Sequence, residues 1–70
     1  MKKSRVDVFV QDDGSIALFR PATKEAEVWF NEHISDDAQW FGSRLVVERR
    51  YVDNLVAGLQ GDGLIVTGEN

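Results

Sequence analysis

The chain has 70 residues, with twelve acidic against eight basic side chains and a net charge of −4 at pH 7. A chain of this length makes one small domain, which buries about 60% of the surface that it exposes when unfolded. The absence of cysteine excludes disulfide bonds and thiolate metal sites, and the acidic balance disfavours direct binding to nucleic acid phosphates.

The first residues carry positive charge without the apolar core of a signal sequence. The segment from Met1 to Arg5 is basic, and a secretory signal would continue with a longer apolar stretch. Acidic and amide side chains interrupt that stretch from Asp7 onward, and no apolar run approaches the roughly 20 residues that span a bilayer. We therefore expect a soluble, cytoplasmic protein whose residues 1–4 fray.

Residues 6–20 predict a β-hairpin, because apolar side chains alternate with polar or larger ones in the period-2 pattern of a half-buried strand. A two-residue turn at 13–14 and a three-residue loop at 12–14 can both join the two strands. We favour the three-residue loop because it gathers one aliphatic face. That face consists of Val6, Val8, Val10, Ile16 and Leu18, and the other face carries Phe9, Ala17 and Phe19.

The next segment predicts a helix with one apolar stripe. Thr23 is a suitable N-cap, and the polar run that begins at Ser35 ends the helix. Within this segment, Ala26, Trp29 and Phe30 recur at helical spacing. Because adjacent residues lie roughly 100° apart around a helix, only one of the two aromatic side chains can be central in the core. We expect Phe30 to be that residue.

Residues 40–47 predict a buried strand. Leu45 to Val47 is a continuous apolar run, as in a strand covered on both faces. Gly42-Ser43 is either the turn of a hairpin that starts with a short 39–41 strand or a plain bend. We expect Trp40 to pack in the core, whereas the position of Phe41 stays open.

The C-terminal third predicts a second helix and a last strand. Val52, Leu55, Val56 and Leu59 stand at i, i+3, i+4 and i+7, which is a narrow apolar stripe. Gly61 ends this helix. Residues 64–67 follow as a strand, and residues 68–70 are expected to fray.

The predicted element order is β-β-α-β-α-β. The third strand, the second helix and the last strand have the length of a crossover unit, so both strands should run parallel in one sheet. We expect a single two-layer α+β domain over residues 1–70, with a mixed sheet of about four strands and both helices on one face.

Aromatic side chains are the first candidates for a binding surface. If both helices cover one face of the sheet, Phe9 and Phe19 form an apolar patch on the other, and such patches mark interfaces. Trp29 and Phe41 are further candidate partner-binding residues, because aromatic side chains at a domain edge are frequent hot spots. The alternative is that another segment, such as Trp40-Phe41, folds over the two rings.

Arg49 and Arg50 are a second candidate site, for an anion. Both lie at the start of the predicted second helix, where the helix dipole disfavours cations. A bound anion would relieve that cost, because free N–H groups and two guanidinium groups bind phosphate well. The alternative is that Glu48 and Asp53 pair with these arginines at the surface.

No pattern of residues indicates catalysis, a metal or a cofactor. His33 has only Asp36 and Asp37 near it in the sequence, which is fewer ligands than a structural zinc site needs. The serines lie in turns or termini outside a nucleophile elbow, and the glycines mark turns rather than a phosphate-binding loop. We therefore expect a non-enzymatic protein that binds no metal or cofactor.

Residues 40–66 also carry a sequence signature, W-x-G-x-x-L-x-V-E-x-R-Y, then a helix, then G-L-x-V. Its positions are Trp40, Gly42, Leu45, Val47, Glu48, Arg50, Tyr51, Gly63, Leu64 and Val66. In these residues the chain resembles a family of small uncharacterised bacterial proteins, and its hairpin and Trp-bearing helix extend the resemblance over most of the chain. The resemblance implies a short stand-alone bacterial or mobile-element protein, and it implies no activity or binding residues.

Two functional hypotheses follow. The first is a small accessory protein that acts as a protein–protein interaction module through the Phe9 and Phe19 face or the exposed aromatics, and a homodimer through the same patch is one version of it. The second is an acidic inhibitor of phage or mobile-element origin that occupies a basic nucleic-acid-binding surface on a host protein. It would need one contiguous surface of Asp12, Asp13, Glu25, Glu27, Glu32, Asp36 and Asp37.

Overall fold

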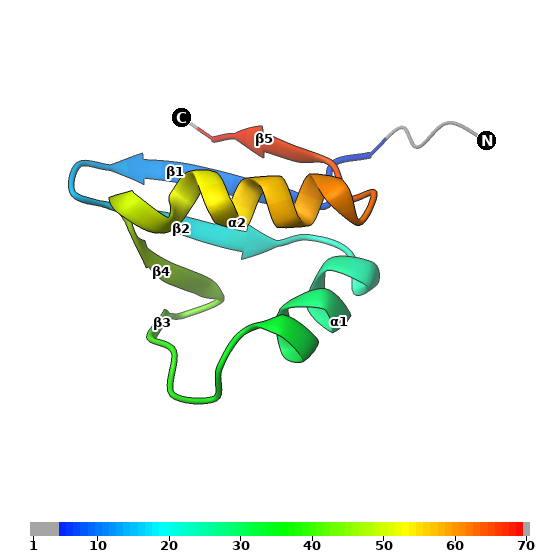
Figure 1. Ribbon diagram of the computed structural model, residues 1–70, viewed down its shortest axis with the longest axis horizontal. Coiled ribbons are helices and arrows are strands. Elements are labelled where there is room, and N and C mark those ends of the chain that lie inside the picture. Colours follow the sequence, from blue (N-terminus) through cyan, green and yellow to red (C-terminus); the bar gives the residue numbers. More distant parts are fainter. Residues whose placement is uncertain (1–4, 70) are drawn as a thin grey trace.

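The computed structural model describes residues 5–69 and contains five strands and two helices in that range (Figure 1). In chain order they are β1 (Val8–Asp13), β2 (Ile16–Pro21), α1 (Lys24–His33), β3 (Trp40–Phe41), β4 (Arg44–Glu48), α2 (Arg49–Gly61) and β5 (Val66–Gly68). Within the described residues, neither helix is long and apolar enough to cross a membrane. The predicted α+β class is confirmed, with one strand more than expected.

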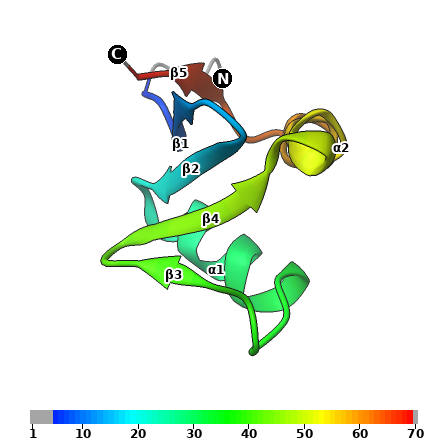
Figure 2. The same ribbon diagram turned by 90° about the vertical axis from the view of Figure 1, so that its left-hand side faces the viewer.

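The five strands form one mixed sheet in the order β3-β4-β2-β1-β5, which Figure 2 shows from bottom to top. Neighbouring strands pair antiparallel except β1 and β5, which are parallel. β4 and β5 therefore run in the same direction, as predicted, although β2 and β1 lie between them. The additional strand is β3. Gly42 adopts a left-handed φ of 62° in the turn between β3 and β4, so the segment is a hairpin rather than a bend.

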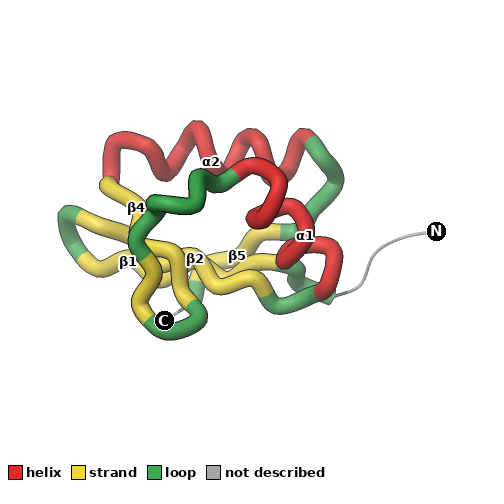
Figure 3. The backbone as a smooth tube through the Cα atoms, turned by 90° about the horizontal axis from the view of Figure 1, so that it is seen from below, coloured by secondary structure: helices red, strands yellow, loops and turns green. Residues whose placement is uncertain are grey.

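Both helices lie on the same face of the sheet (Figure 3). α1 contacts β2, and α2 contacts β2, β4 and β5. Phe30 of α1 is 2% exposed, so its predicted place in the core is confirmed. The core between the two layers consists of Val8, Ala17, Phe19, Ala26, Phe30, Leu45, Val47, Leu59 and Leu64.

The hairpin of β1 and β2 turns at Gly14 and Ser15. Gly14 has a φ of 79°, which suits the first position of a two-residue hairpin turn. Both turns considered from the sequence are therefore wrong, and the strands pair in another register. Val10 lies opposite Phe19, which puts Phe19 on the helix-covered face and Leu18 on the opposite face.

A buried carboxylate joins β1 to α1 and to the segment before β5. Asp7 is 0% exposed. It accepts hydrogen bonds from the Thr23 hydroxyl at 2.7 Å and from the Ile65 backbone N–H at 2.8 Å. Thr23 is the N-cap of α1, as predicted, and its Oγ1 accepts a 3.2 Å bond from the Ala26 N–H. The start of α1 is thus fixed to the sheet by a polar contact inside the protein.

The C-terminal residues continue the sheet instead of fraying. Gly68 is the last residue of β5, and the Glu69 N–H donates a 2.7 Å hydrogen bond to the carbonyl of Val10. The fraying expected for residues 68–70 is therefore wrong for Gly68 and Glu69. Residues 1–4 and 70, where fraying was also expected, lie outside the described residues.

Candidate functional site

The face of the sheet opposite the helices carries the candidate site, and we call it the open face. Successive side chains of a strand point to opposite faces, so residues adjacent to core positions point to the open face. They form three rows across the strands. The first row is Phe41, Arg44, Arg20 and Phe9; the middle row is Val46, Leu18 and Gln11; the third row is Glu48, Ile16 and Asp13.

Ile16, Leu18 and Val46 form the apolar centre of the open face. None of the three belongs to the core cluster under the helices. Together with Phe41 they line a shallow pocket with a volume of about 300 Å³. Phe41 is 71% exposed. The open face therefore presents apolar surface from β2 to the end of β3.

A hydrogen-bonded network crosses the same face, and we call it the charged strap. It consists of Arg20, Arg44, Glu69 and Gln11. Arg44 Nη1 donates to Gln11 Oε1 at 3.1 Å and to Glu69 Oε1 at 2.9 Å. Arg20 Nη2 donates to Glu69 Oε2 at 3.4 Å, and its guanidinium carbon lies 4.6 Å from the centre of the Phe9 ring. The two arginines are neighbours on adjacent strands and would repel each other. Glu69 compensates that repulsion because it binds both.

The charge of the strap follows from the state of Glu69. The hydrogen bond from Arg44 is the main cause that lowers the pKa of Glu69, desolvation opposes it, and the attraction of the Arg44 and Arg20 charges adds to the lowering. Glu69 is therefore ionised at neutral pH. Two arginines and one carboxylate leave the strap with one net positive charge.

No protein-family model, curated protein or solved structure matches this chain. Within residues 5–69, no group of three or more histidine, aspartate and glutamate side chains could hold a metal ion. The groups gathered on the open face are apolar side chains, aromatic rings and an ion-paired network. These groups are suited to noncovalent binding.

Two aromatic residues differ from their predicted positions. Phe19 is 0% exposed, so it belongs to the core and cannot contact a partner in the folded protein. Trp40 is 42% exposed and packs against Phe30 with ring centroids 6.1 Å apart, so its predicted core position is wrong. Of the candidate partner-binding residues, Phe9 and Phe41 lie on the open face.

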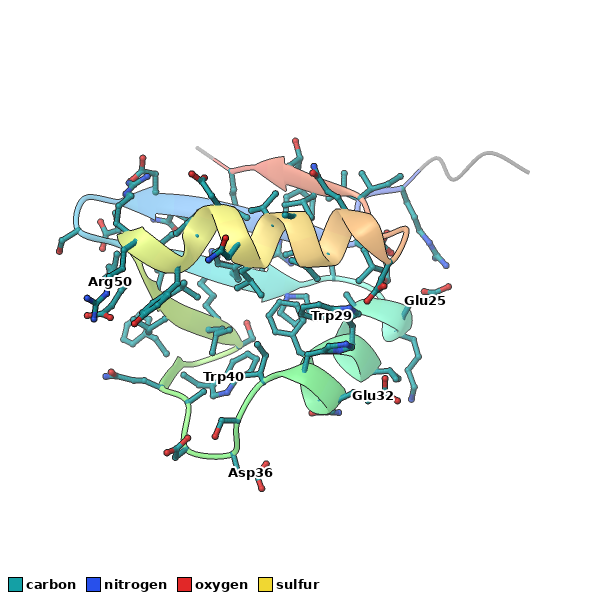
Figure 4. All side chains as sticks on the ribbon, in the orientation of Figure 1. Glu25, Trp29, Glu32, Asp36, Trp40 and Arg50 are labelled. Carbon is teal, nitrogen blue, oxygen red and sulfur yellow. The ribbon has the colours of Figure 1, made fainter. Side chains whose placement is uncertain are left out.

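Trp29 lies between the two helices, on the other side of the sheet (Figure 4). Its indole N–H donates a 2.6 Å hydrogen bond to Asp62, and its ring stacks on His33 with centroids 4.1 Å apart. The ring also reaches Gly58 of α2, where an added Cβ would stand 3.5 Å away. Trp29 thus joins α1 to α2 and is not part of the open face.

Arg49 and Arg50 bind separate carboxylates. Arg49 forms an ion pair with Asp12 and donates a 3.0 Å hydrogen bond to the carbonyl of Gly14, so it ties the hairpin turn to the start of α2. Arg50 forms the predicted pair with Glu48 at 3.2 Å. Each guanidinium group therefore has its own counter-charge. Both arginines do open α2, where the helix dipole disfavours cations. The alternative of surface ion pairs agrees better with the structure, although the carboxylate beside Arg49 is Asp12 and not Asp53.

Most of the open face does not follow from the sequence patterns. The favoured three-residue loop places Ile16 and Leu18 on the core face, and the signal against that loop is Gly14, which fits the first position of a Gly-X hairpin turn. Val46 belongs to the apolar run that predicts a strand covered on both faces. No local pattern points to Glu69, because its partners are 25 and 49 residues away in the sequence.

Proposed function

We propose that this chain is a non-enzymatic interaction module that binds a protein through its open face. The observation that carries the proposal is the grouping of Ile16, Leu18 and Val46 with the exposed ring of Phe41, on a face that no described element covers. Removing such apolar surface from water is the main driving force of protein association.

The chemistry of the open face favours a protein over a nucleic acid. Its apolar centre is bordered by charged and amide side chains, which is the usual composition of a protein interface. Arg20 and Arg44 are shared with Glu69, which leaves the strap only one net positive charge to attract a phosphate. The net charge of −4 adds long-range repulsion of nucleic acid.

The proposed setting is the cytoplasm of a bacterium or its mobile elements. The cysteine-free sequence is compatible with a reducing compartment. The resemblance carried by residues 40–66 supports a small protein of bacterial or mobile-element origin.

The second candidate function is an acidic inhibitor of a basic protein surface. Fewer carboxylates than the seven predicted lie together for that role. Asp12 belongs to β1 near the hairpin turn and already pairs with an arginine. Glu25, Glu32 and Asp36 lie along α1 and the loop after it, away from Arg50 and the start of α2 (Figure 4). The predicted acidic surface is therefore divided between the hairpin end and this α1 group, so the open face is the better supported site.

The test is affinity capture with two matched variants. Val46→Glu places a charge in the apolar centre of the open face, whereas Val28→Glu makes the same change on α1, where Val28 is 42% exposed. Tagged wild type and both variants are incubated with an extract of the native cells, supplemented with the untagged chain. Circular dichroism first establishes that the two variants are folded.

We expect a polypeptide, either a cellular protein or the untagged chain, that wild type and Val28→Glu retain and Val46→Glu loses. The proposal fails if all three retain the same polypeptides or if none retains any. Capture that is lost on changing Glu25 and Glu32 to glutamine, and not on changing Val46, would favour the acidic inhibitor instead.

A further inference from the structure

The charges of the open face are arranged so that one copy of the face complements another. Arg44 and Arg20 stand in the first row, at one end of β4 and β2. Glu48 and Asp13 stand in the third row, at the other end. The uncharged middle row separates them, with Leu18 at its centre. Each open face therefore has a basic end, an apolar centre and an acidic end along its strand direction.

We propose that the partner of the open face is a second copy of this chain, in a symmetric face-to-face dimer. This inference rests on the proposed function, because it uses the same surface and specifies what binds there. Symmetric dimers bury the same patch of both copies, so the patch must complement itself under a two-fold rotation. The charge layout satisfies this condition in one orientation.

Two orientations bring two such sheets face to face with aligned strands. A two-fold axis along the strands would stack first row on first row, so that arginines meet arginines. A two-fold axis across the strands reverses the strand direction of the second copy and stacks first row on third row. The charges select the second orientation, because like charges held together cost free energy and opposite charges attract.

In the selected orientation the main contacts follow from the rows. Arg44 lies opposite Glu48 of the partner subunit, and the same contact occurs twice by symmetry. The Glu48 side chain is 61% exposed and accepts from Arg50 through Oε1, so its Oε2 can accept from Arg44 of the partner subunit. Arg44 binds Gln11 and Glu69 through Nη1, and a guanidinium group has further N–H donors. Val46 lies near its own symmetry copy at the axis, whereas Leu18, which is only 9% exposed, adds little to the contact.

The size of the face sets the strength of the dimer. β1, β2 and β4 have five or six residues each, whereas β3 has two and β5 three. At about 3.3 Å per residue and about 4.8 Å between strands, the face measures roughly 350 Å² per copy, hence roughly 700 Å² in total. This is below the roughly 1,200 Å² at which stable interfaces begin, so we expect a weak, reversible dimer that forms at high micromolar to millimolar concentration.

Sedimentation velocity over micromolar to millimolar concentrations tests the dimer with a charge swap. Arg44→Glu and Glu48→Arg each place like charges opposite each other, so each should weaken association by about tenfold or more. The double variant restores opposite charges and should restore the dimer even though it lacks the native strap. Glu25→Arg on α1 changes the charge equally away from the face and should leave association unchanged.

Single cysteines test the position of the axis, because the chain has no cysteine of its own. Val46→Cys should form a disulfide-linked dimer under mild oxidation, whereas Ala57→Cys on the exposed side of α2 should not. The inference is overturned if wild type stays monomeric, if neither charge reversal weakens the dimer, or if only the α2 cysteine cross-links. A monomer that still captures a cellular protein through Val46 would overturn the dimer and leave the proposed function standing.

Discussion

Arg44 of β4 donates a 2.9 Å hydrogen bond to Glu69, which follows β5, although β2 and β1 lie between these strands in the sheet. The Arg44 side chain also reaches Gln11 of β1, so it passes over β2. Leu18 of β2, on the same face, is only 9% exposed although no helix covers that face. One side chain thus links strands that are not neighbours in the sheet.

Glu69→Gln should destabilise the protein at neutral pH, and the effect should depend on pH. The pKa of Glu69 is lowered in the folded state from its ordinary value of 4.5, so its stabilisation is fully present above that value. It is lost as pH falls through the lowered pKa. Urea unfolding of wild type and Glu69→Gln, repeated from neutral to acidic pH, should give midpoints that converge at low pH.

An Arg44→Met background provides the control for Glu69→Gln. Arg44 supplies the principal interaction of Glu69, so removing Glu69 in that background should change the urea midpoint much less. Equal effects of Glu69→Gln with and without Arg44 would mean that the stabilisation by Glu69 does not come from its bond to Arg44.

Asp7→Ala should be strongly destabilising. It leaves the Thr23 hydroxyl and the Ile65 N–H without the carboxylate that accepts from them, and each unsatisfied buried group costs about 1–3 kcal/mol. We expect a loss of about 3 kcal/mol in the free energy of unfolding, measured by urea denaturation. Thr23→Ser keeps the hydroxyl and should change much less, whereas Thr23→Ala should lose the N-cap, at about 1 kcal/mol. A mild Asp7→Ala would show that the network is dispensable.

Gly58→Ala should stabilise the protein. An added Cβ would stand 3.5 Å from the Trp29 ring, which is an ordinary van der Waals contact, and alanine is about 1 kcal/mol better than glycine inside a helix. Thermal unfolding should show a higher Tm for Gly58→Ala. Gly58→Leu should instead displace Trp29 and lower the Tm. Destabilisation by the alanine would show that α1 and α2 need the glycine to approach each other.

Phe19→Ala and Phe41→Ala should differ sharply in stability. Phe19 is 0% exposed, and truncating a buried phenylalanine costs about 3–5 kcal/mol, which is comparable with the whole stability of so small a domain. Phe41 is 71% exposed, so its truncation should change stability by less than about 0.5 kcal/mol. Circular dichroism during urea unfolding measures both. Similar losses would contradict the register of the hairpin.

The elements were predictable because their patterns are local, whereas the register of the hairpin was not. Residues 16–19 are all apolar, so alternation alone could not tell which of Leu18 and Phe19 faces the helices. The observed turn also extends β1 through Asp12 and Asp13, although aspartate is a poor strand former. Tertiary packing of Phe19 in the core outweighs that local preference.

The polar features of the site depend on residues distant in sequence. Nothing near Asp7 in the sequence indicates that it accepts hydrogen bonds from Thr23 and Ile65, which approach it only in the folded protein. The sequence predicts a frayed end at Glu69 because its binding to Arg44 cannot be seen locally. The helix N-cap at Thr23, by contrast, was predictable because capping involves neighbouring residues.

The outermost strands of the sheet are also its shortest, with two residues in β3 and three in β5. Each edge strand therefore presents few backbone N–H and C=O groups that could pair with a further strand. Short edge strands protect natural sheets from edge-to-edge aggregation in this way. Growth of the sheet sideways into fibrils is disfavoured. The proposed stack of two faces would be finite, so association through the open face would not extend the sheet into a fibril.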